Sequence, residues 1–269
     1  MTRSRLHGGV PVHVSHDEQG SIEVVDSAGV RALHFGTPHR QSAMALADPH
    51  RLELAYTRSM LAALLFCGQP RRVLLVGLGG GSLAKFLWRN FPQCRIDAVE
   101  QRAAVMRVAH GWFDLPEDDR LQIWVADGAD YVAEAPQRGD SYDLILLDAY
   151  DGLGMASAML NQAFLDRCAA LLAPDGACAA NLWGSNRPLL DYALDRFGQS
   201  FAGPVLRLPV PGRGNVIGLA FPGPMPRPDW RKLKSRAEGL EAQLGVEFPA
   251  LVRQLRRMNG GWAERLLGL

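Results

Sequence analysis

Two acidic residues lie three positions apart in the segment Asp148-Ala149-Tyr150-Asp151, directly after the apolar run 142–147. Two carboxylates that face one cleft can bind a cation, or they can hold an amine while one of them accepts its proton. An amine of ordinary pKa is mostly protonated at neutral pH, and a nearby carboxylate must orient and deprotonate it before it can attack. Asp148 and Asp151 are therefore candidate catalytic residues, with helix capping or loop hydrogen bonding as the alternative role.

A glycine-rich segment, Gly77-Leu78-Gly79-Gly80-Gly81-Ser82, follows a second apolar run at 73–76. The run predicts a buried strand, and glycines let the backbone turn sharply and lie close against a ligand because they have no Cβ. We expect Ser82 to cap the helix that follows. Strand, loop and helix N-terminus together form a cradle for a nucleotide, with an ordinary tight turn as the alternative interpretation. The candidate binding residues of this loop are Gly77, Gly79, Gly80 and Gly81.

Acidic residues also follow the next two apolar runs of the chain. Glu100 ends the expected strand 95–100, and it lies roughly 20 residues after the first glycine, where an acid accepts ribose hydroxyls. Asp127 and Gly128 follow the expected strand 121–125. Ligands of a doubly wound sheet lie beyond the carboxyl ends of its strands, so these residues should converge with the glycine loop and Asp148. The sequence thus predicts a nucleoside-containing ligand at this edge.

The elements that position these residues alternate between strands and helices. Alternation of this kind predicts an α/β fold with a doubly wound, mostly parallel sheet and right-handed crossovers. The expected strands cover 73–76, 95–100, 121–125, 142–147 and 177–182, and the expected helices cover 82–89, 103–112, 129–134, 164–168 and 189–197.

The flanking segments have different patterns. Residues 10–36 alternate between apolar and polar types with glycine turns, which predicts a small antiparallel sheet. A helix is expected over 51–66, a hairpin of strands 204–208 and 215–221 should close the sheet edge, and two basic amphipathic helices are expected at 230–244 and 248–258. We therefore divide the chain into an N-terminal β region (1–48), a nucleoside-binding catalytic domain (49–222) and a C-terminal helical tail (223–269).

The composition narrows the classes of function. The chain has 269 residues, of which 48% are hydrophobic, and its net charge of +1 argues against a general nucleic-acid binder. No apolar run approaches the roughly 20 residues of a membrane span, and the first residues lack the apolar stretch of a signal peptide. The four cysteines are scattered without a CxxC pair, so we expect no metal site and a cytoplasmic protein with reduced thiols.

Taken together, the motifs resemble the spermidine synthase family of polyamine aminopropyltransferases. The resemblance implies a Rossmann-like sheet of the S-adenosylmethionine-dependent methyltransferase type and a homodimer. It also implies transfer of an aminopropyl group from decarboxylated S-adenosylmethionine to an amine such as putrescine, with release of methylthioadenosine and without a metal. The residues that carry it are the small β region, Gln41-Ser42, Tyr56, the loop 77–81, Glu100, Asp127-Gly128, Asp148 to Asp151 and Pro174-Asp175-Gly176.

The resemblance also implies a role for each candidate residue. Asp148 would be the general base or the residue that orients the amine, and Tyr56 and Asp151 would assist it. The glycine loop would approach the nucleoside and the methionine-derived chain, and Gln41 would lie along the nucleoside pocket. From the residues alone, Tyr56 can also be a core helix residue and Gln41 a surface residue. Finally, Glu100 would hold the ribose, and Asp127, followed by Gly128, would contact the adenine amino group.

Two positions depart from the family pattern. Gly80 stands where the family carries an acid that grips the aminopropyl nitrogen, and Tyr56-Thr57-Arg58 replaces a Tyr-His-Glu motif. A basic Arg58 beside the cleft would repel a polyamine unless it points away. These departures keep two other hypotheses open: a methyltransferase or other transferase that uses intact S-adenosylmethionine, and a non-catalytic nucleoside-binding homologue. The sequence does not identify the amine acceptor.

Overall fold

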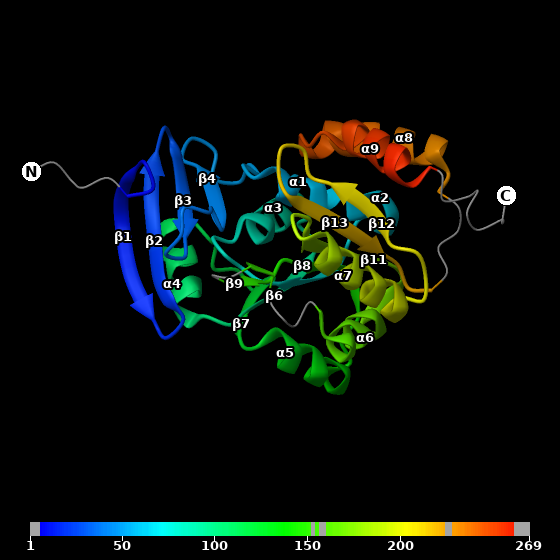
Figure 1. Cartoon of the computed structure of the whole chain (residues 1–269), viewed down its shortest axis with the longest axis horizontal. Helices are drawn as coiled ribbons and strands as arrows, with labels where there is room; N and C mark the ends of the chain where they lie inside the picture. Colours follow the sequence, from blue (N-terminus) through cyan, green and yellow to red (C-terminus); the bar gives the residue numbers. More distant parts are fainter. Residues whose placement is uncertain (1–5, 152–153, 156–159, 224–227, 261–269) are drawn as a thin grey trace, which may run out of the picture.

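The computed structural model of the chain describes residues 6–151, 154–155, 160–223 and 228–260. Its first part is a four-stranded antiparallel sheet in the order β1-β2-β3-β4 (Figure 1). The sheet predicted over 10–36 is confirmed, and β4 extends it past the predicted region because a strand of four residues leaves little pattern in the sequence. The strands are β1 (Val10–Asp17), β2 (Gly20–Ser27), β3 (Val30–His34) and β4 (Ser42–Ala45).

A seven-stranded sheet forms the centre of the molecule, in the order β12-β13-β11-β8-β5-β6-β7. Strands β11, β8, β5, β6 and β7 run parallel, whereas β13 and β12 are antiparallel, as the predicted hairpin requires. Chain order reverses beside β5, which has β8 on one side and β6 on the other, so a crevice-forming switch point lies there. The strands are β5 (Arg72–Val76), β6 (Arg95–Glu100), β7 (Leu121–Val125), β8 (Tyr142–Leu147), β11 (Leu172–Trp183), β12 (Leu206–Pro209) and β13 (Asn215–Ala220).

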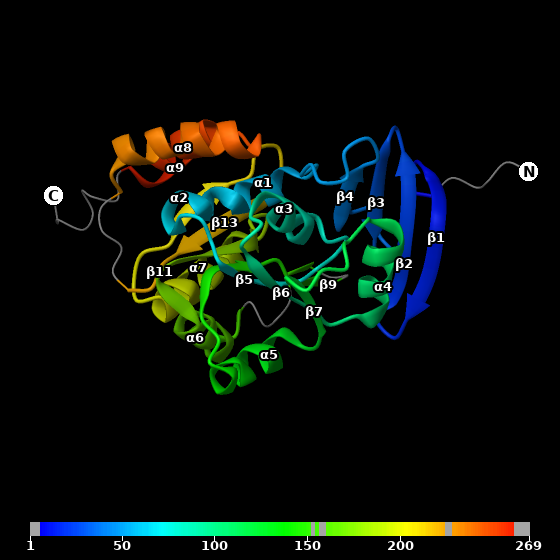
Figure 2. The ribbon, with the colours of Figure 1, turned by 180° about the vertical axis from the view of Figure 1, so that it is seen from behind.

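Helices cover both faces of this sheet (Figures 1 and 2). On one face lie α1 (Ala55–Met60), η1 (Leu61–Ala63), α2 (Leu64–Cys67) and α3 (Ser82–Asn90), whose buried apolar residues form one core cluster with β5 and β11. On the other lie α5 (Gly128–Glu134), η2 (Ala135–Arg138), α6 (Gln162–Ala170) and α7 (Arg187–Ser200), which form a second cluster. The predicted doubly wound α/β fold is therefore confirmed. A short hairpin of β9 (Tyr150–Asp151) and β10 (Gly154–Met155) follows β8.

Three helices connect this core to its flanks. Helix α4 (Ala103–Trp112) contributes Val105 and Val108 to an apolar cluster with the small N-terminal sheet. Helices α8 (Trp230–Leu244) and α9 (Phe248–Asn259) pack outside α1 and α2, and their buried leucines join the same cluster as the central sheet. None of the described helices has both the length and the apolar character needed to cross a membrane.

The N-terminal ends of α1 and α3 differ from the sequence-based prediction in ways that have a clear physical cause. The helix expected over 51–66 begins only at Ala55, because Arg58 Nη1 donates to the backbone oxygens of Leu52 and Glu53 and holds them as a loop. The predicted capping role of Ser82 is wrong: Gly81, with φ +72°, is the N-cap of α3, and Ser82 is its first residue. The left-handed backbone at Gly81 sets the helix start, since this conformation costs glycine little.

Candidate active site

The glycine loop lies against the residue that follows β8. The Asp148 backbone N–H donates to the Val76 oxygen at 2.8 Å, and the Gly77 N–H donates to the Val99 oxygen at 2.9 Å. Gly77 has φ +97°, and a methyl group placed on it would overlap the backbone oxygen of Asp148. Only glycine fits this position, and its absent side chain lets the loop and Asp148 lie side by side at the carboxyl edge of the sheet.

Glu100, at the end of β6, is held by the backbone of the same edge. Its Oε2 accepts the Leu78 N–H at 3.2 Å, and its Oε1 accepts the Arg102 N–H at 2.9 Å. Burial raises the pKa of this carboxyl, and the backbone N–H groups of Arg102, Leu78 and Gly79 oppose that rise. A carboxylate has about four acceptor sites, so with three backbone donors the group can still accept a ligand hydroxyl.

The Asp148 carboxylate interacts with neutral donors. Asn181 Nδ2 donates to its Oδ1 at 2.8 Å, and the Tyr56 hydroxyl also hydrogen-bonds to it. Burial raises the pKa of Asp148 to about 7, although both donors act in the opposite direction. Within the described residues, no cationic side chain pairs with this carboxylate. A carboxyl group with a pKa near the working pH is suited to accept and release a proton.

Tyr56 and Gln41 bring two other parts of the chain to this place. The Tyr56 hydroxyl lies 3.3 Å from the backbone oxygen of Gln41, so α1 and the segment before β4 meet beside Asp148. A methyl group on Gly79 would lie 3.8 Å from the same Gln41 oxygen, which places Gln41 along the glycine loop. Tyr56 thus contacts both the candidate base and the segment of Gln41.

Asp127 and Gly128 stand at the start of α5. Asp127 is its N-cap, and Oδ1 accepts the N–H groups of Ala129 at 2.7 Å and Asp130 at 3.4 Å. A methyl group on Gly128 would lie 2.8 Å from Val76 Cγ1, so glycine allows α5 to pack closely on β5. The cap fixes the direction of the Asp127 carboxylate, beside the end of β6.

Gly80 has no room for a side chain. A methyl group there would lie 2.8 Å from Phe113 Cδ1 and 2.9 Å from Ser42 Oγ. Ser42 is buried, and its hydroxyl lies 3.1 Å from that of Ser82. The position that departs from the family pattern is therefore enclosed by Phe113 and Ser42, and a larger residue would displace them.

Arg58 and Thr57 do not face Asp148. Arg58 Nε pairs with Glu247 Oε1 at 2.9 Å, at the start of α9. The Thr57 hydroxyl donates to the Leu54 oxygen at 2.7 Å within the first turn of α1. The guanidinium group that could repel a polyamine thus points away from the site.

The structure brings ten of the predicted site residues, Asp148 among them, to the carboxyl edge of the central sheet. The eleventh, Asp151, has no described side chain. The backbone of Asp151 lies in β9, and its side chain lies outside the described part of the chain. Sequence reasoning missed Asn181, although a polar residue inside the apolar run 177–182 was a usable signal. It also missed Asn215, and the edge-on ring contact of His39 with Trp183 at 6.4 Å. The residues that converge are Gln41, Tyr56, Gly77, Gly79, Gly80, Gly81, Glu100, Asp127, Gly128 and Asp148.

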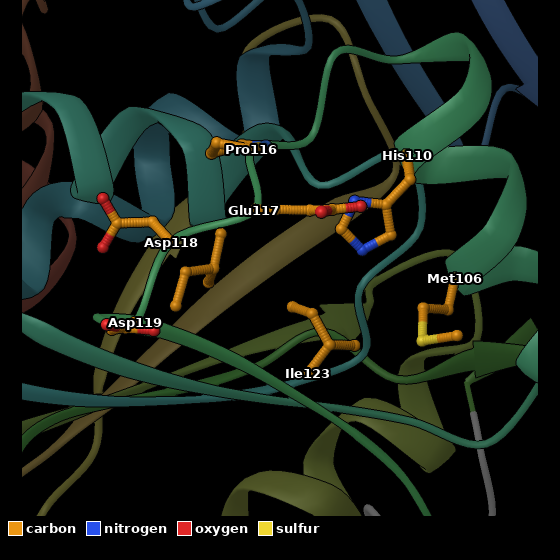
Figure 3. Close-up of a pocket in the computed structure, with 8 residues that line it drawn as sticks. Met106, His110, Pro116, Glu117, Asp118, Asp119 and Ile123 are labelled. Atoms are coloured by element: carbon orange, nitrogen blue, oxygen red, sulfur yellow. The ribbon is translucent and has the colours of Figure 1, made fainter.

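A separate hollow lies between α4 and β7 (Figure 3). Met106 and His110 of α4 face Ile123 of β7 across it, and Glu117, Asp118 and Asp119 line its rim. Its wall is formed by β7 from Leu121 onward, away from the carboxyl edge that carries Asp127. The acidic side chains of Figure 3 are thus not the predicted acid pair. Within the described residues, no three histidine, cysteine or acidic side chains form a group that could hold a metal ion.

Comparison with known proteins places the chain in a family. A model of the spermine/spermidine synthase domain matches residues 53–182. A polyamine aminopropyltransferase of Chromobacterium violaceum is 37% identical over 247 residues, which cover 91% of this chain and 93% of that protein. The fold and the matching family model define a Rossmann-like transferase. The chain belongs to the spermidine synthase family of polyamine aminopropyltransferases, as its motifs indicate.

Two solved structures illustrate the likeness of this fold to known proteins. A spermidine synthase in complex with the transition state analogue AdoDATO has a TM-score of 0.68 and 17% identity, and the match covers 93% of this chain and 88% of that chain. Human methyltransferase-like protein 13 in complex with SAH has a TM-score of 0.66 and 29% identity, over 71% of this chain and 93% of that chain. The likeness to the spermidine synthase, at 17% identity, concerns the fold alone.

Proposed function

We propose that this protein is an aminopropyltransferase that uses decarboxylated S-adenosylmethionine and an amine acceptor, and releases methylthioadenosine. Family membership supports the reaction class. The observation that carries the assignment is the state of Asp148, whose buried carboxylate is hydrogen-bonded by Asn181 and Tyr56 but has no cationic partner among the described residues. An ammonium group would supply the missing charge, which favours a cationic substrate over a neutral one.

The raised pKa of Asp148 also suits proton transfer from an amine. A carboxyl at its ordinary value of 3.8 lies about 7 pKa units below an alkylammonium group, whereas a carboxyl at about 7 lies about 3 units below it. The smaller gap makes deprotonation of the bound amine less unfavourable. The amine lone pair then forms a bond to the carbon next to the sulfonium sulfur. The carbon–sulfur bond breaks with its electron pair on sulfur, and the amine proton goes to Asp148.

The other residues of the edge would bind the donor. Glu100 would hold the ribose through its hydroxyls, and the backbone of the loop 77–81 would lie under the nucleoside and its chain. The capping hydrogen bonds orient the Asp127 carboxylate, which would accept a hydrogen bond from the adenine amino group. We propose Gln41 as a wall of this pocket, and Tyr56 and Asp151 as assistants of Asp148.

Turnover with a panel of amines tests the proposal. The protein is incubated with decarboxylated S-adenosylmethionine and diamines or polyamines of different length, and methylthioadenosine is quantified by chromatography. We expect release that depends on both the amine and Asp148, so that Asp148→Asn abolishes it while Asp166→Asn, on the exposed surface of α6, does not. Absence of release with every amine would contradict the assignment.

Methyl transfer from intact S-adenosylmethionine is the second candidate, and Gly80 is the observation that favours it. With no side chain at this position, the loop presents no acid that would repel the carboxylate of the intact donor. Calorimetric titration with the two donors separates the candidates. Tighter binding of the decarboxylated donor supports aminopropyl transfer, and tighter binding of the intact donor supports the methyltransferase.

A homodimer in the cytoplasm is the further proposal that follows from the family. Light scattering coupled to size-exclusion chromatography would give the mass in solution, and a monomer at micromolar concentration would contradict the proposed dimer. Fractionation of cells that express the chain would test the compartment.

A further inference from the structure

A buried asparagine links Asp148 to a strand that does not touch the glycine loop. Asn181 is 2% exposed and lies in β11, among apolar residues. Its Nδ2 donates to Asp148 Oδ1 at 2.8 Å, and its Oδ1 accepts from Asn215 Nδ2 at 3.0 Å. Asn215 begins β13, the antiparallel neighbour of β11. The two amides and the carboxylate therefore form a chain of hydrogen bonds across three strands.

The two bonds fix which end of the Asn181 amide faces Asp148. If the amide turned by half a rotation, its oxygen would meet the carboxylate and its NH2 group would meet the NH2 group of Asn215. With the Asn215 amide unchanged, both bonds would be lost at the buried Asn181 side chain, where an unpaired polar group is strongly unfavourable. The Asp148 carboxylate can only accept, so the carboxylate and Asn215 together favour the orientation in which Asn181 presents a donor to the candidate base.

We infer that Asn215 and Asn181 act as a two-amide relay that positions the Asp148 carboxylate for the incoming amine. The inference rests on the proposed function for the amine, and both asparagines are positioning residues in it. Besides Asn181 from β11, Tyr56 from α1 hydrogen-bonds to Asp148, and no charged side chain among the described residues acts on it. The Asp151 side chain lies outside the described residues, so its effect is removed by comparison within an Asp151→Asn background.

Asn215→Asp is the variant that reverses the relay. Its carboxylate cannot donate to Asn181 Oδ1, and it instead attracts the Asn181 NH2 group, so the Asn181 oxygen turns toward Asp148. Loss of one hydrogen bond to a charged group corresponds to a rise of about one unit in the pKa of Asp148. At pH 7 turnover would fall about fivefold and recover at pH 9, because only the ionised carboxylate accepts a proton.

Two controls separate the relay from the added charge. Asn215→Leu removes the hydrogen-bond donor to Asn181 and adds no charge. It should also raise the pKa of Asp148, but by less than Asn215→Asp does. In an Asn181→Leu background the relay is already broken, so Asn215→Asp should produce only its direct electrostatic effect there. The double-mutant cycle therefore isolates the part that passes through Asn181.

The experiment follows the Asp148 carboxyl by carbon-13 NMR in protein labelled at aspartate, with the resonance assigned from Asp148→Asn. Circular dichroism checks the fold of each variant, and Asn215→Leu replaces Asn215→Asp if the latter does not fold. If Asn215→Asp raises the pKa of Asp148 more in the parent than in the Asn181→Leu background, the relay is supported. Equal rises in the two backgrounds overturn it. The titration needs no turnover, so failure of the proposed function and failure of the relay give different results.

Discussion

Asp97 and Asp148 are two acids of the same sheet, and their surroundings differ in charge. Asp97 lies inside β6 and is 7% exposed. Its oxygens accept hydrogen bonds from Arg72 Nη2, Trp124 Nε1 and the Tyr142 hydroxyl, each at 3.1 Å. Asp148 has neutral donors only among the described residues. A carboxylate that already has a cation is a structural element, whereas one without a cation remains available to a ligand.

The position of each acid in the sheet explains the difference. Asp97 stands in the middle of β6, paired in register with Leu74 of β5, where side chains of neighbouring strands can surround it. Asp148 follows the last residue of β8, where the strands end and solvent or a ligand can approach. An acid just past a strand end at the switch point is therefore a better candidate for chemistry than an acid inside a strand.

Asp148→Asn is the change with the largest expected effect. It removes the proton acceptor while it preserves the shape of the side chain, so turnover should fall about 10²- to 10⁴-fold. Steady-state release of methylthioadenosine measures this loss. Asp97→Asn serves as the matched variant, and at a temperature where it stays folded it should keep most of its activity. Equal losses in the two variants would remove the distinction between the acids.

The second-largest expected effect is the change in the free energy of unfolding with pH, which the titration of Asp148 should produce. The pKa of Asp148 is raised from 3.8 to about 7 in the folded protein, so between these values the folded state binds more protons than the unfolded state. The free energy of unfolding should therefore fall as pH rises from about 4 to about 7, by at most about 4 kcal/mol from this group.

Urea titrations at several pH values measure this dependence. Asp148→Asn should flatten it and make the protein more stable than the parent at pH 8. If the dependence were the same in parent and variant, Asp148 would not be the group that titrates.

Asp97→Asn should lower the free energy of unfolding by about 2–3 kcal/mol, because it leaves Arg72 without one of its two carboxylate partners in a mostly buried place. Arg72 keeps Asp140, at 2.6 Å, which limits the loss. Urea denaturation at pH 7 gives the value. A variant as stable as the parent would contradict the structural role of this acid.

The sequence was sufficient for the parts of the fold that local patterns determine. Strand ends such as Glu100 and the start of the helix at Ala103 were predicted to the residue, because apolar strands alternate with helices whose ends are polar. The convergence of the glycine loop and Asp148 followed from the rule that ligands lie at the carboxyl ends of parallel strands. These predictions needed no knowledge of side-chain contacts.

Other features depend on contacts between distant segments. Asn215 reaches Asn181 only because β13 pairs with β11, and no pattern near residue 215 announces that partner. Ser82 looked like a helix cap, yet its hydroxyl lies against Ser42 of β4, 40 residues earlier in the chain. The sequence left open whether Arg58 points away from the cleft, because its partner Glu247 lies 189 residues later in the chain.

Arg58→Gln is the change with the smallest expected effect, and it tests where the cation of α1 points. The Arg58 side chain is 27% exposed and pairs with Glu247, which is 49% exposed, so the pair contributes little in water. Loss of the pair and of the bonds to the loop before α1 should lower the free energy of unfolding by about 1 kcal/mol. The KM for the amine should stay within about twofold of the parent value, because the guanidinium group faces α9 and not Asp148.

Glu247→Gln breaks the same ion pair from its other end and is the matched control. If Arg58 instead repelled the substrate, Arg58→Gln would lower the KM strongly while Glu247→Gln would raise it.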